Sequence, residues 1–119
     1  MTSEISAYGE CDATELAAMV QRGDVSAREL VDEAIRRCEA VNGELNAVIT
    51  TMFEQARDAA AQPPGDGPFA GVPFLMKDFV AEVAGVPFTE GSEFLRDYVP
   101  DEDSEIYRRF CAAGLITIR

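Results

Sequence analysis

The chain has 119 residues, 47% of them hydrophobic, and carries 22 acidic against 10 basic side chains for a formal net charge of −12. This length corresponds to about one domain with a real hydrophobic core. The acidic charge argues against nucleic acid as a partner, because nucleic acid requires basic patches, and against anionic membrane surfaces.

The first predicted helix follows a lead-in at residues 1–11 that we expect to be loose. That lead-in lacks the positive region and the apolar stretch of a secretion signal, so we expect none. Asp12 and Glu15 have the spacing of a capping box, with an N-cap acid and a glutamate three residues later. A helix is therefore predicted from there to about Arg22, with Gly23 as its stop.

The second predicted helix starts with another capping box, formed by Ser26 and Glu29. Apolar residues recur at helical spacing from Leu30 onward, which indicates one face packed against a core. We expect this helix to end at Asn42-Gly43, because glycine and asparagine are typical of helix ends.

The next part of the chain alternates short elements. Residues 45–51 are rich in β-branched side chains and predict a strand. Residues 52–62 predict a helix with alanines and Phe53 facing inward. The stretch 63–68 consists of proline, glycine and aspartate and predicts a surface loop rather than a domain linker, because the residues before it have too little core to stand alone.

The central stretch of the chain is Gly71–Phe79. Here glycine and proline precede the apolar run Phe74-Leu75-Met76, which predicts a buried strand followed by Lys77 and Asp78. A lysine directly after such a run would leave its stem in the core and its amine near the carboxyl end of the sheet. In open α/β sheets, ligands bind at that end.

Lys77 is the only lysine in the sequence, since the other nine basic residues are arginines. A partly buried lysine can lose its proton, whereas arginine stays charged. Lys77 is therefore the one basic group that could act as a general base. The structural alternative is a strand-end lysine that extends to water or pairs with Asp78.

After the central stretch, residues 80–98 have no sustained periodicity. Thr89–Ser92 predicts a turn, followed by a short helical piece around Phe94 and Leu95. The acidic run 101–104 is interpreted as the N-terminus of a helix and not as a cation site, because the helix dipole stabilises acidic residues there. That helix is expected to stop at Gly114, and residues 115–118 predict a final strand.

This order of elements indicates an α/β fold, because strands separated by helical crossovers pair in parallel. The sequence predicts three strands, and the last of them is its final element. Because parallel sheets are normally covered on both faces, we expect this sheet to be incomplete. We therefore expect a single partial domain at 1–119, with a helical lead-in at about 12–42 and an α/β part at about 45–119.

Absent residue types narrow the chemistry further. Without histidine the chain itself offers no Ser-His-Asp or Cys-His arrangement and lacks the commonest transition-metal ligand. Cys11, Cys38 and Cys111 are widely spaced, which indicates neither a zinc site nor a disulfide framework and fits a cytoplasmic protein. The sequence has no apolar run near 18 residues, so we expect no membrane span, and we expect no cofactor.

Several motifs resemble the amidase signature family. Gly71-Val72-Pro73-Phe74-Leu75-Met76-Lys77-Asp78 is similar to the family's G-[VI]-P-x-x-x-K-D segment, and Thr89-Glu90-Gly91-Ser92 is similar to its T-x-G-S turn. The helix from Ser26, and residues 103–116, resemble family segments in the same order. Nearly the whole chain, about 12 to 118, takes part. The lead-in to Gly71 is similar to the branch that contains cyclic-amide and aryl-amide hydrolases.

The resemblance implies a fold and a chemistry. The chain is identified as an N-terminal fragment of the amidase signature fold, a mixed or parallel sheet flanked by helices that stays incomplete here. Family members hydrolyse small carboxamides through a serine nucleophile, a bridging serine with a cis peptide, and a lysine that matches Lys77. As general base this lysine must be neutral, and apolar surroundings favour the neutral amine. The run Phe74-Leu75-Met76 is expected to supply them.

The resemblance also implies missing parts. The family's two catalytic serines lie in a Gly/Ser-rich segment, and none of the five serines of this sequence does. We therefore expect one catalytic group of three and no activity from these residues alone. Alternatives are a non-catalytic truncated product and an acidic helical interaction module. The first two helices are interpreted as a surface that could serve a homodimer.

Overall fold

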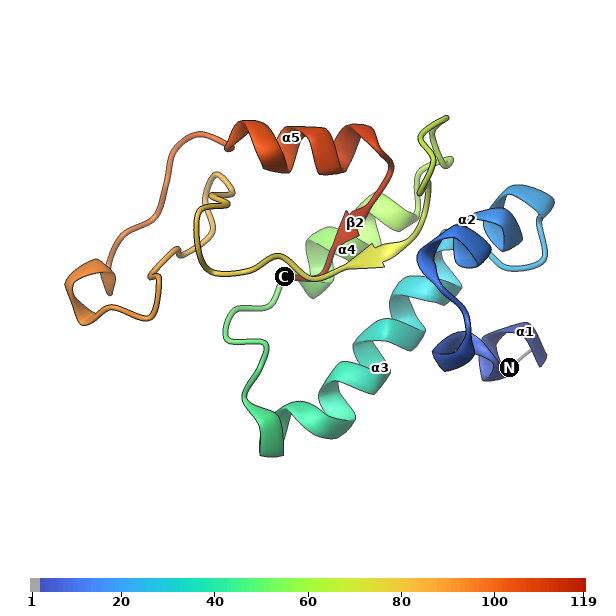
Figure 1. The fold of residues 1–119 in the computed structure, drawn as a ribbon, viewed down its shortest axis with the longest axis horizontal. Helices are drawn as coiled ribbons and strands as arrows, with labels where there is room; N and C mark the ends of the chain where they lie inside the picture. Colours follow the sequence, from blue (N-terminus) through green and yellow to red (C-terminus); the bar gives the residue numbers. More distant parts are fainter. Residues whose placement is uncertain (1–2) are drawn as a thin grey trace.

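The computed structural model describes residues 3–119. Its helices and strands, in chain order, are α1 (Ser3–Ser6), the 3-10 helix η1 (Tyr8–Glu10), α2 (Ala13–Arg22), α3 (Ala27–Leu45), α4 (Phe53–Ala60), β1 (Pro73–Phe74), the 3-10 helix η2 (Glu93–Leu95), α5 (Glu105–Ala112) and β2 (Ile116–Thr117). Figure 1 shows the short strands in the middle of the molecule, with the long helix α3 below them and α5 along the top of the view.

The sheet consists of β1 and β2, which pair in parallel with Pro73 opposite Ile116 and Phe74 opposite Thr117. The crossover from β1 to β2 runs through α5, as expected for a parallel pair. This confirms the predicted α/β class and the incomplete sheet. The strand predicted over the apolar run Phe74-Leu75-Met76 is shorter than expected and begins one residue earlier, because only Pro73 and Phe74 have a paired neighbour, and both are half-buried rather than buried.

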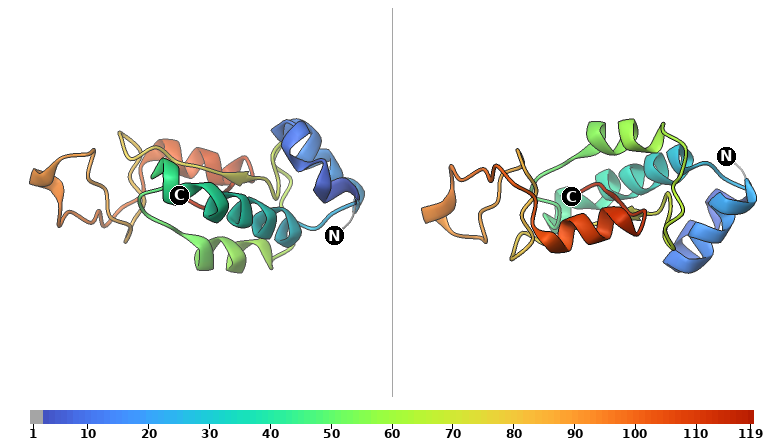
Figure 2. Two further views of the ribbon diagram at one scale, coloured as in Figure 1. Left: turned by 90° about the horizontal axis from the view of Figure 1, so that it is seen from below. Right: turned by 90° about the horizontal axis from the view of Figure 1, so that it is seen from above.

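Helices cover the two faces of this small sheet. Ile116 and Ile118 alternate with Thr117, so both point to the face that α3 and α4 pack against. On the other face the ring of Phe74 lies 4.8 Å, centroid to centroid, from the ring of Phe110 on α5. Figure 2 shows α5 on the opposite side from α4. The arrangement is a three-layer α/β/α sandwich around two strands.

The N-terminal helices pack as a second cluster. Asp12 caps α2 by accepting a 2.9 Å hydrogen bond from the backbone N–H of Glu15, and Gly23 ends it with φ 79°. The prediction of a loose lead-in is wrong for residues 3–10, which form α1 and η1 with a turn between them, because Ile5 is only 4% exposed and packs into the core. Residues 1–2 lie outside the described part. The buried members of this cluster are Ile5, Leu16, Met19, Val20, Val25, Leu30 and Val72.

Helix α3 begins as predicted and ends later. Both halves of the capping box between Ser26 and Glu29 are formed. The predicted end at Asn42-Gly43 is wrong, because the helix continues to Leu45. A helix tolerates one glycine at a cost of about 1 kcal/mol. The side chain of Asn42 also bonds to the N–H and the carbonyl of Val48, at 2.8 and 2.9 Å, which holds the chain that leaves the helix.

The predicted strand at 45–51 is wrong. In the described chain these residues finish α3 and then continue without regular secondary structure. The next residue, Met52, donates a 3.1 Å backbone hydrogen bond to the carbonyl of Ile118, directly after β2. The β-branched composition of residues 45–51 fits a pleated, half-buried surface. Without a paired strand beside them, that composition alone does not produce a ladder. Ile49 is accordingly 54% exposed.

An arm formed by residues 80–103 extends from the body, as Figure 1 shows in yellow and orange. Its turn at Thr89–Ser92 is confirmed by a 2.8 Å bond from the N–H of Ser92 to the carbonyl of Thr89. The expected short helical piece is η2. The acidic run does begin a helix, because the Ser104 hydroxyl caps α5, while Asp103 accepts a bond from the N–H of Ala84.

Candidate functional site

Lys77 lies three residues after β1, at the carboxyl edge of the parallel pair. Its side chain is exposed, so the prediction of an amine in apolar surroundings is wrong for the described residues. The reason is the direction of its neighbours. Met76 is buried, but Leu75 and Phe79 are 53% and 55% exposed and turn away from the core. Extension of the lysine to water, the structural alternative, is what these residues show.

A cavity of about 280 Å³ adjoins Lys77. Four separate parts of the chain contribute to it. The lining residues are Ala47, Val48, Ile49, Met76, Lys77, Asp78, Gly91 and Arg119. The cavity thus joins the extended stretch after α3, the stretch after β1, the turn of the arm and the residue after β2. Its position matches the edge at which parallel sheets bind ligands.

Asp78 is the centre of the polar contacts in this cavity. Its Oδ1 accepts a 2.9 Å bond from the N–H of Thr89, and its Oδ2 accepts a 2.7 Å bond from the Thr89 hydroxyl. Its ion pair is with Arg119, whose Nη2 lies 3.0 Å from Oδ1. The alternative that Asp78 pairs with Lys77 is therefore wrong, because the carboxylate is bound by these other donors.

Arg119 is the polar residue that sequence reasoning missed. Its side chain is 2% exposed, it donates from Nη2 to Asp78 and to the carbonyl of Pro87, and its Nη1 is buried without a hydrogen-bond partner. Nothing in the sequence distinguishes this arginine from the other eight. Thr89 was recognisable as part of the T-x-G-S turn, but its bond to Asp78 was not.

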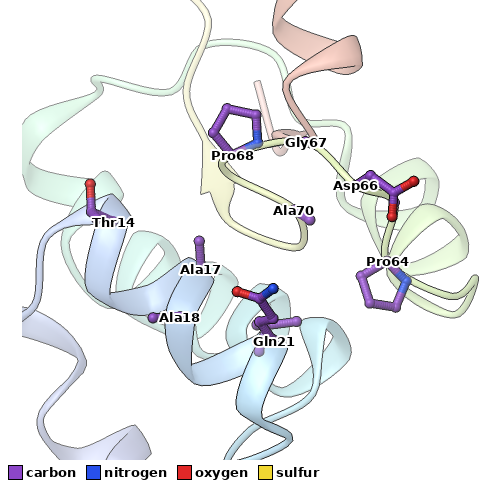
Figure 3. A pocket seen from close by; sticks show the side chains of 11 residues that line it. Thr14, Ala17, Ala18, Gln21, Pro64, Asp66, Gly67, Pro68 and Ala70 are labelled. Carbon is purple, nitrogen blue, oxygen red and sulfur yellow. The ribbon is translucent and has the colours of Figure 1, made fainter.

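A larger cavity lies between α2 and the loop 64–70, with a volume of about 690 Å³ (Figure 3). Thr14 and Gln21 approach it from α2, and Asp66 from the loop. Among its lining residues Asp66 is the only ionisable side chain, so it offers no acid–base pair. Lys77 is not part of it, which leaves the 280 Å³ cavity as the candidate site.

Two further properties of residues 3–119 bear on the class of site. These residues contain no group of three or more histidine, cysteine, aspartate or glutamate side chains able to hold a metal ion. No helix among them combines the length and the apolar character that a membrane span requires.

Comparisons with known proteins agree with the motifs. The family model named Amidase matches residues 29–118. A Mycobacterium tuberculosis protein that is named as an amidase, AmiC, is 42% identical over 113 residues, which cover 94% of this chain and 24% of that protein. The 6-aminohexanoate-cyclic-dimer hydrolase of Paenarthrobacter ureafaciens is 38% identical over 109 residues, or 90% of this chain and 22% of the relative.

Solved structures give the same result. The 6-aminohexanoate cyclic dimer hydrolase complexed with substrate superposes with a TM-score of 0.83 at 37% identity, covering 91% of this chain and 22% of that one. A bacterial aryl acylamidase of the amidase signature family superposes with a TM-score of 0.82 at 30% identity. The chain thus spans about a quarter of the length of its relatives. It belongs to the amidase signature family and has the fold of that family's N-terminal part.

Proposed function

We propose that this chain carries the catalytic lysine of a hydrolase that cleaves the C–N bond of a carboxamide, and that Lys77 is this residue. The observation that carries the proposal is the position of Lys77, directly before Asp78 and at the carboxyl edge of β1, within the segment that the Amidase model covers. The named relatives support an amide as substrate, in linear or cyclic form.

In the proposed reaction, neutral Lys77 accepts a proton through a bridging serine, and the nucleophilic serine then attacks the amide carbon. The C–N bond breaks as the amine takes up a proton, and water hydrolyses the resulting acyl-enzyme. No cofactor is required. Because Lys77 is exposed among the described residues, we propose that parts of the full-length enzyme beyond these residues cover it and favour its neutral form.

Three of the serines, Ser26, Ser92 and Ser104, cap helices, which supports a nucleophile from elsewhere. The hydroxyls of Ser26, Ser92 and Ser104 each accept a hydrogen bond from a backbone N–H at the start of a helix. We therefore propose that residues 1–119 alone do not hydrolyse amides. A cytoplasmic location and a homodimer through α2 and α3 stay predictions.

The decisive experiment replaces Lys77 in a protein that contains both the chain and a Gly/Ser-rich segment. Sequencing the coding DNA after codon 119 provides that protein if such a segment with two serines follows. Lys77→Met should then lower kcat for an aryl amide by about 10²–10⁴-fold, the contribution of a general base, while Arg96→Met, an exposed control on the arm, should leave it unchanged. Full activity of Lys77→Met would refute the assignment.

The same sequencing separates the enzyme from its alternative. A non-catalytic, acidic interaction module is favoured if no Gly/Ser-rich segment follows in any reading frame. In that case Lys77→Met should have no more effect on any function of the chain than Arg96→Met has.

A further inference from the structure

One carboxylate connects three of the chain segments that line the Lys77 cavity. Asp78 is bonded to Lys77 through the backbone, to Thr89 through two hydrogen bonds, and to Arg119 through an ion pair. Thr89 opens the turn that carries Gly91, which itself lines the cavity. The shape of the cavity beside Lys77 therefore depends on the hydrogen bonds and the ion pair that the Asp78 side chain makes.

The turn that Asp78 holds has a fixed shape. Glu90 and Gly91 have φ angles of 52° and 69°, which is the pattern of a type I′ turn. A 2.8 Å bond from the N–H of Ser92 to the carbonyl of Thr89 closes it. Because Asp78 engages both the N–H and the hydroxyl of Thr89, the turn is fixed in position as well as in shape.

Asp78 also neutralises the charge of a buried arginine, Arg119. Arg119 is 2% exposed in its side chain, and such a buried guanidinium requires a counter-charge. Asp78 supplies it, at 13% exposure. Removal of this carboxylate would leave Arg119 buried with two poorly satisfied nitrogens, since its Nη1 already has no partner. The geometry of the cavity and the pairing of its buried charge thus depend on the same residue.

We propose that Asp78 is a positioning residue for Lys77, which fixes the turn 89–92 and Arg119 around the lysine side chain. The carboxylate lies one residue from Lys77 and binds partners 11 and 41 positions away in the sequence. It therefore determines where the backbone of Lys77 sits relative to the rest of the cavity. The inference rests on the proposed role of Lys77, but its test requires no catalysis.

The test uses the fact that Lys77 is the only lysine, so that a sample labelled with ¹⁵N-lysine gives a single backbone N–H signal, which reports the position of the Lys77 backbone. In the 119-residue chain, Asp78→Asn and Thr89→Val should move this signal toward its random-coil position. The amides of Thr89 and Gly91 should also exchange their hydrogens about tenfold faster or more. Thr89→Ser, which keeps the hydroxyl, and Asp97→Asn, an exposed carboxylate on the same arm, should resemble the wild type.

An unchanged lysine signal and unchanged amide exchange in both Asp78→Asn and Thr89→Val would overturn the proposal. If Asp78→Asn loses the helical circular dichroism of the wild type, Thr89→Val decides alone, because it keeps the ion pair to Arg119. A purely structural role of Asp78 would lower stability without moving the Lys77 signal of the folded protein, which also contradicts the proposal. Neither result affects the separate kinetic test of Lys77.

Discussion

Glu33 is a buried carboxylate on α3, 4% exposed, that is held by two arginines. Arg36 donates to both of its oxygens, at 2.8 and 2.9 Å, and Arg37 donates to Oε1 at 2.7 Å. The hydrogen bond from Arg36 is the largest cause that lowers the pKa of Glu33, to about 2. The guanidinium of Arg37 also lies 5.1 Å from the ring centroid of Tyr8, so this group ties the N-terminal segment to α3.

This geometry predicts acid sensitivity. A carboxylate with a lowered pKa stabilises the folded state above its ordinary pKa of 4.5, and that stability is lost as the pH falls toward about 2. Glu33→Gln should lower the free energy of unfolding at pH 7 by about 1–2 kcal/mol, a modest value because the arginine side chains are 58% and 40% exposed. It should also flatten the dependence of stability on pH between 5 and 2.

Urea unfolding at several pH values measures both effects. Glu54→Gln is the matched control, because Glu54 pairs with Arg57 at 2.7 Å but is 83% exposed in its side chain. Equal pH dependence in Glu33→Gln and the wild type would contradict the assigned role of Glu33.

For single residues, the sequence identified which residue belongs to the candidate site, but it did not predict whether that residue is buried or what it contacts. Lys77 and its segment were recognisable by motif, and the match of the Amidase family model to residues 29–118 confirms the family. Its exposure was not predictable, because whether an apolar run covers a side chain depends on which neighbours turn inward. The partners of Asp78 were equally hidden, since they lie 11 and 41 positions away.

At the level of elements, helices with capping signals were predicted well and strands poorly. The caps of α2, α3 and α5 act within four residues, so the sequence alone specifies them. Strands depend on distant partners, and β1 and β2 are only two residues each. Residues 45–51 show why strands are hard to predict from composition. They are rich in β-branched side chains, but no strand of the described chain pairs with them.

The corner between α5 and β2 gives a prediction at this level. Gly114 has φ 96°, and a Cβ there would lie 2.5 Å from the backbone of Ala70. Gly114→Ala should therefore lower the free energy of unfolding by about 2 kcal/mol or more. Gly43, inside α3, has no atom within 4 Å of such a Cβ, so Gly43→Ala should raise it by about 0.5–1 kcal/mol.

Chemical denaturation of the two variants against the wild type tests this pair. Opposite signs are expected for the same chemical change, because one glycine is required by close backbone contact and the other is merely tolerated in a helix. A Gly114→Ala variant as stable as Gly43→Ala would show that the loop 67–70 does not pack on this corner.

On the scale of the molecule, the surface along α3 and β1 is unusually apolar for a chain with a net charge of −12. A groove of about 600 Å³ runs along the C-terminal half of α3 and past β1. Val41, Leu45 and Leu75 contribute to it and are 50%, 66% and 53% exposed. Apolar patches of this kind are rarely left open on monomeric proteins.

We therefore expect the 119-residue chain to bind a hydrophobic dye or to self-associate, and to leave aryl and aliphatic amides uncleaved. Dye fluorescence, sedimentation and an amidase assay measure these properties. Leu45→Gln should reduce dye binding, while Leu95→Gln on the arm serves as control. A monomer that binds no dye and unfolds in one sharp, cooperative transition would contradict the expected apolar surface. Amide turnover that Lys77→Ala abolishes would contradict the expected lack of activity.

The separation of the paired strands has a kinetic consequence. Pro73 meets Ile116 about 40 residues later, and closing a loop of that length costs about 3 kcal/mol of chain entropy before any strand contact forms. Helices α2 and α3, whose contacts are local, should then be in place first. Because the pocket beside the lysine needs Arg119, it is completed only at the last stage of folding, so any slowing of that stage delays the site more than the scaffold.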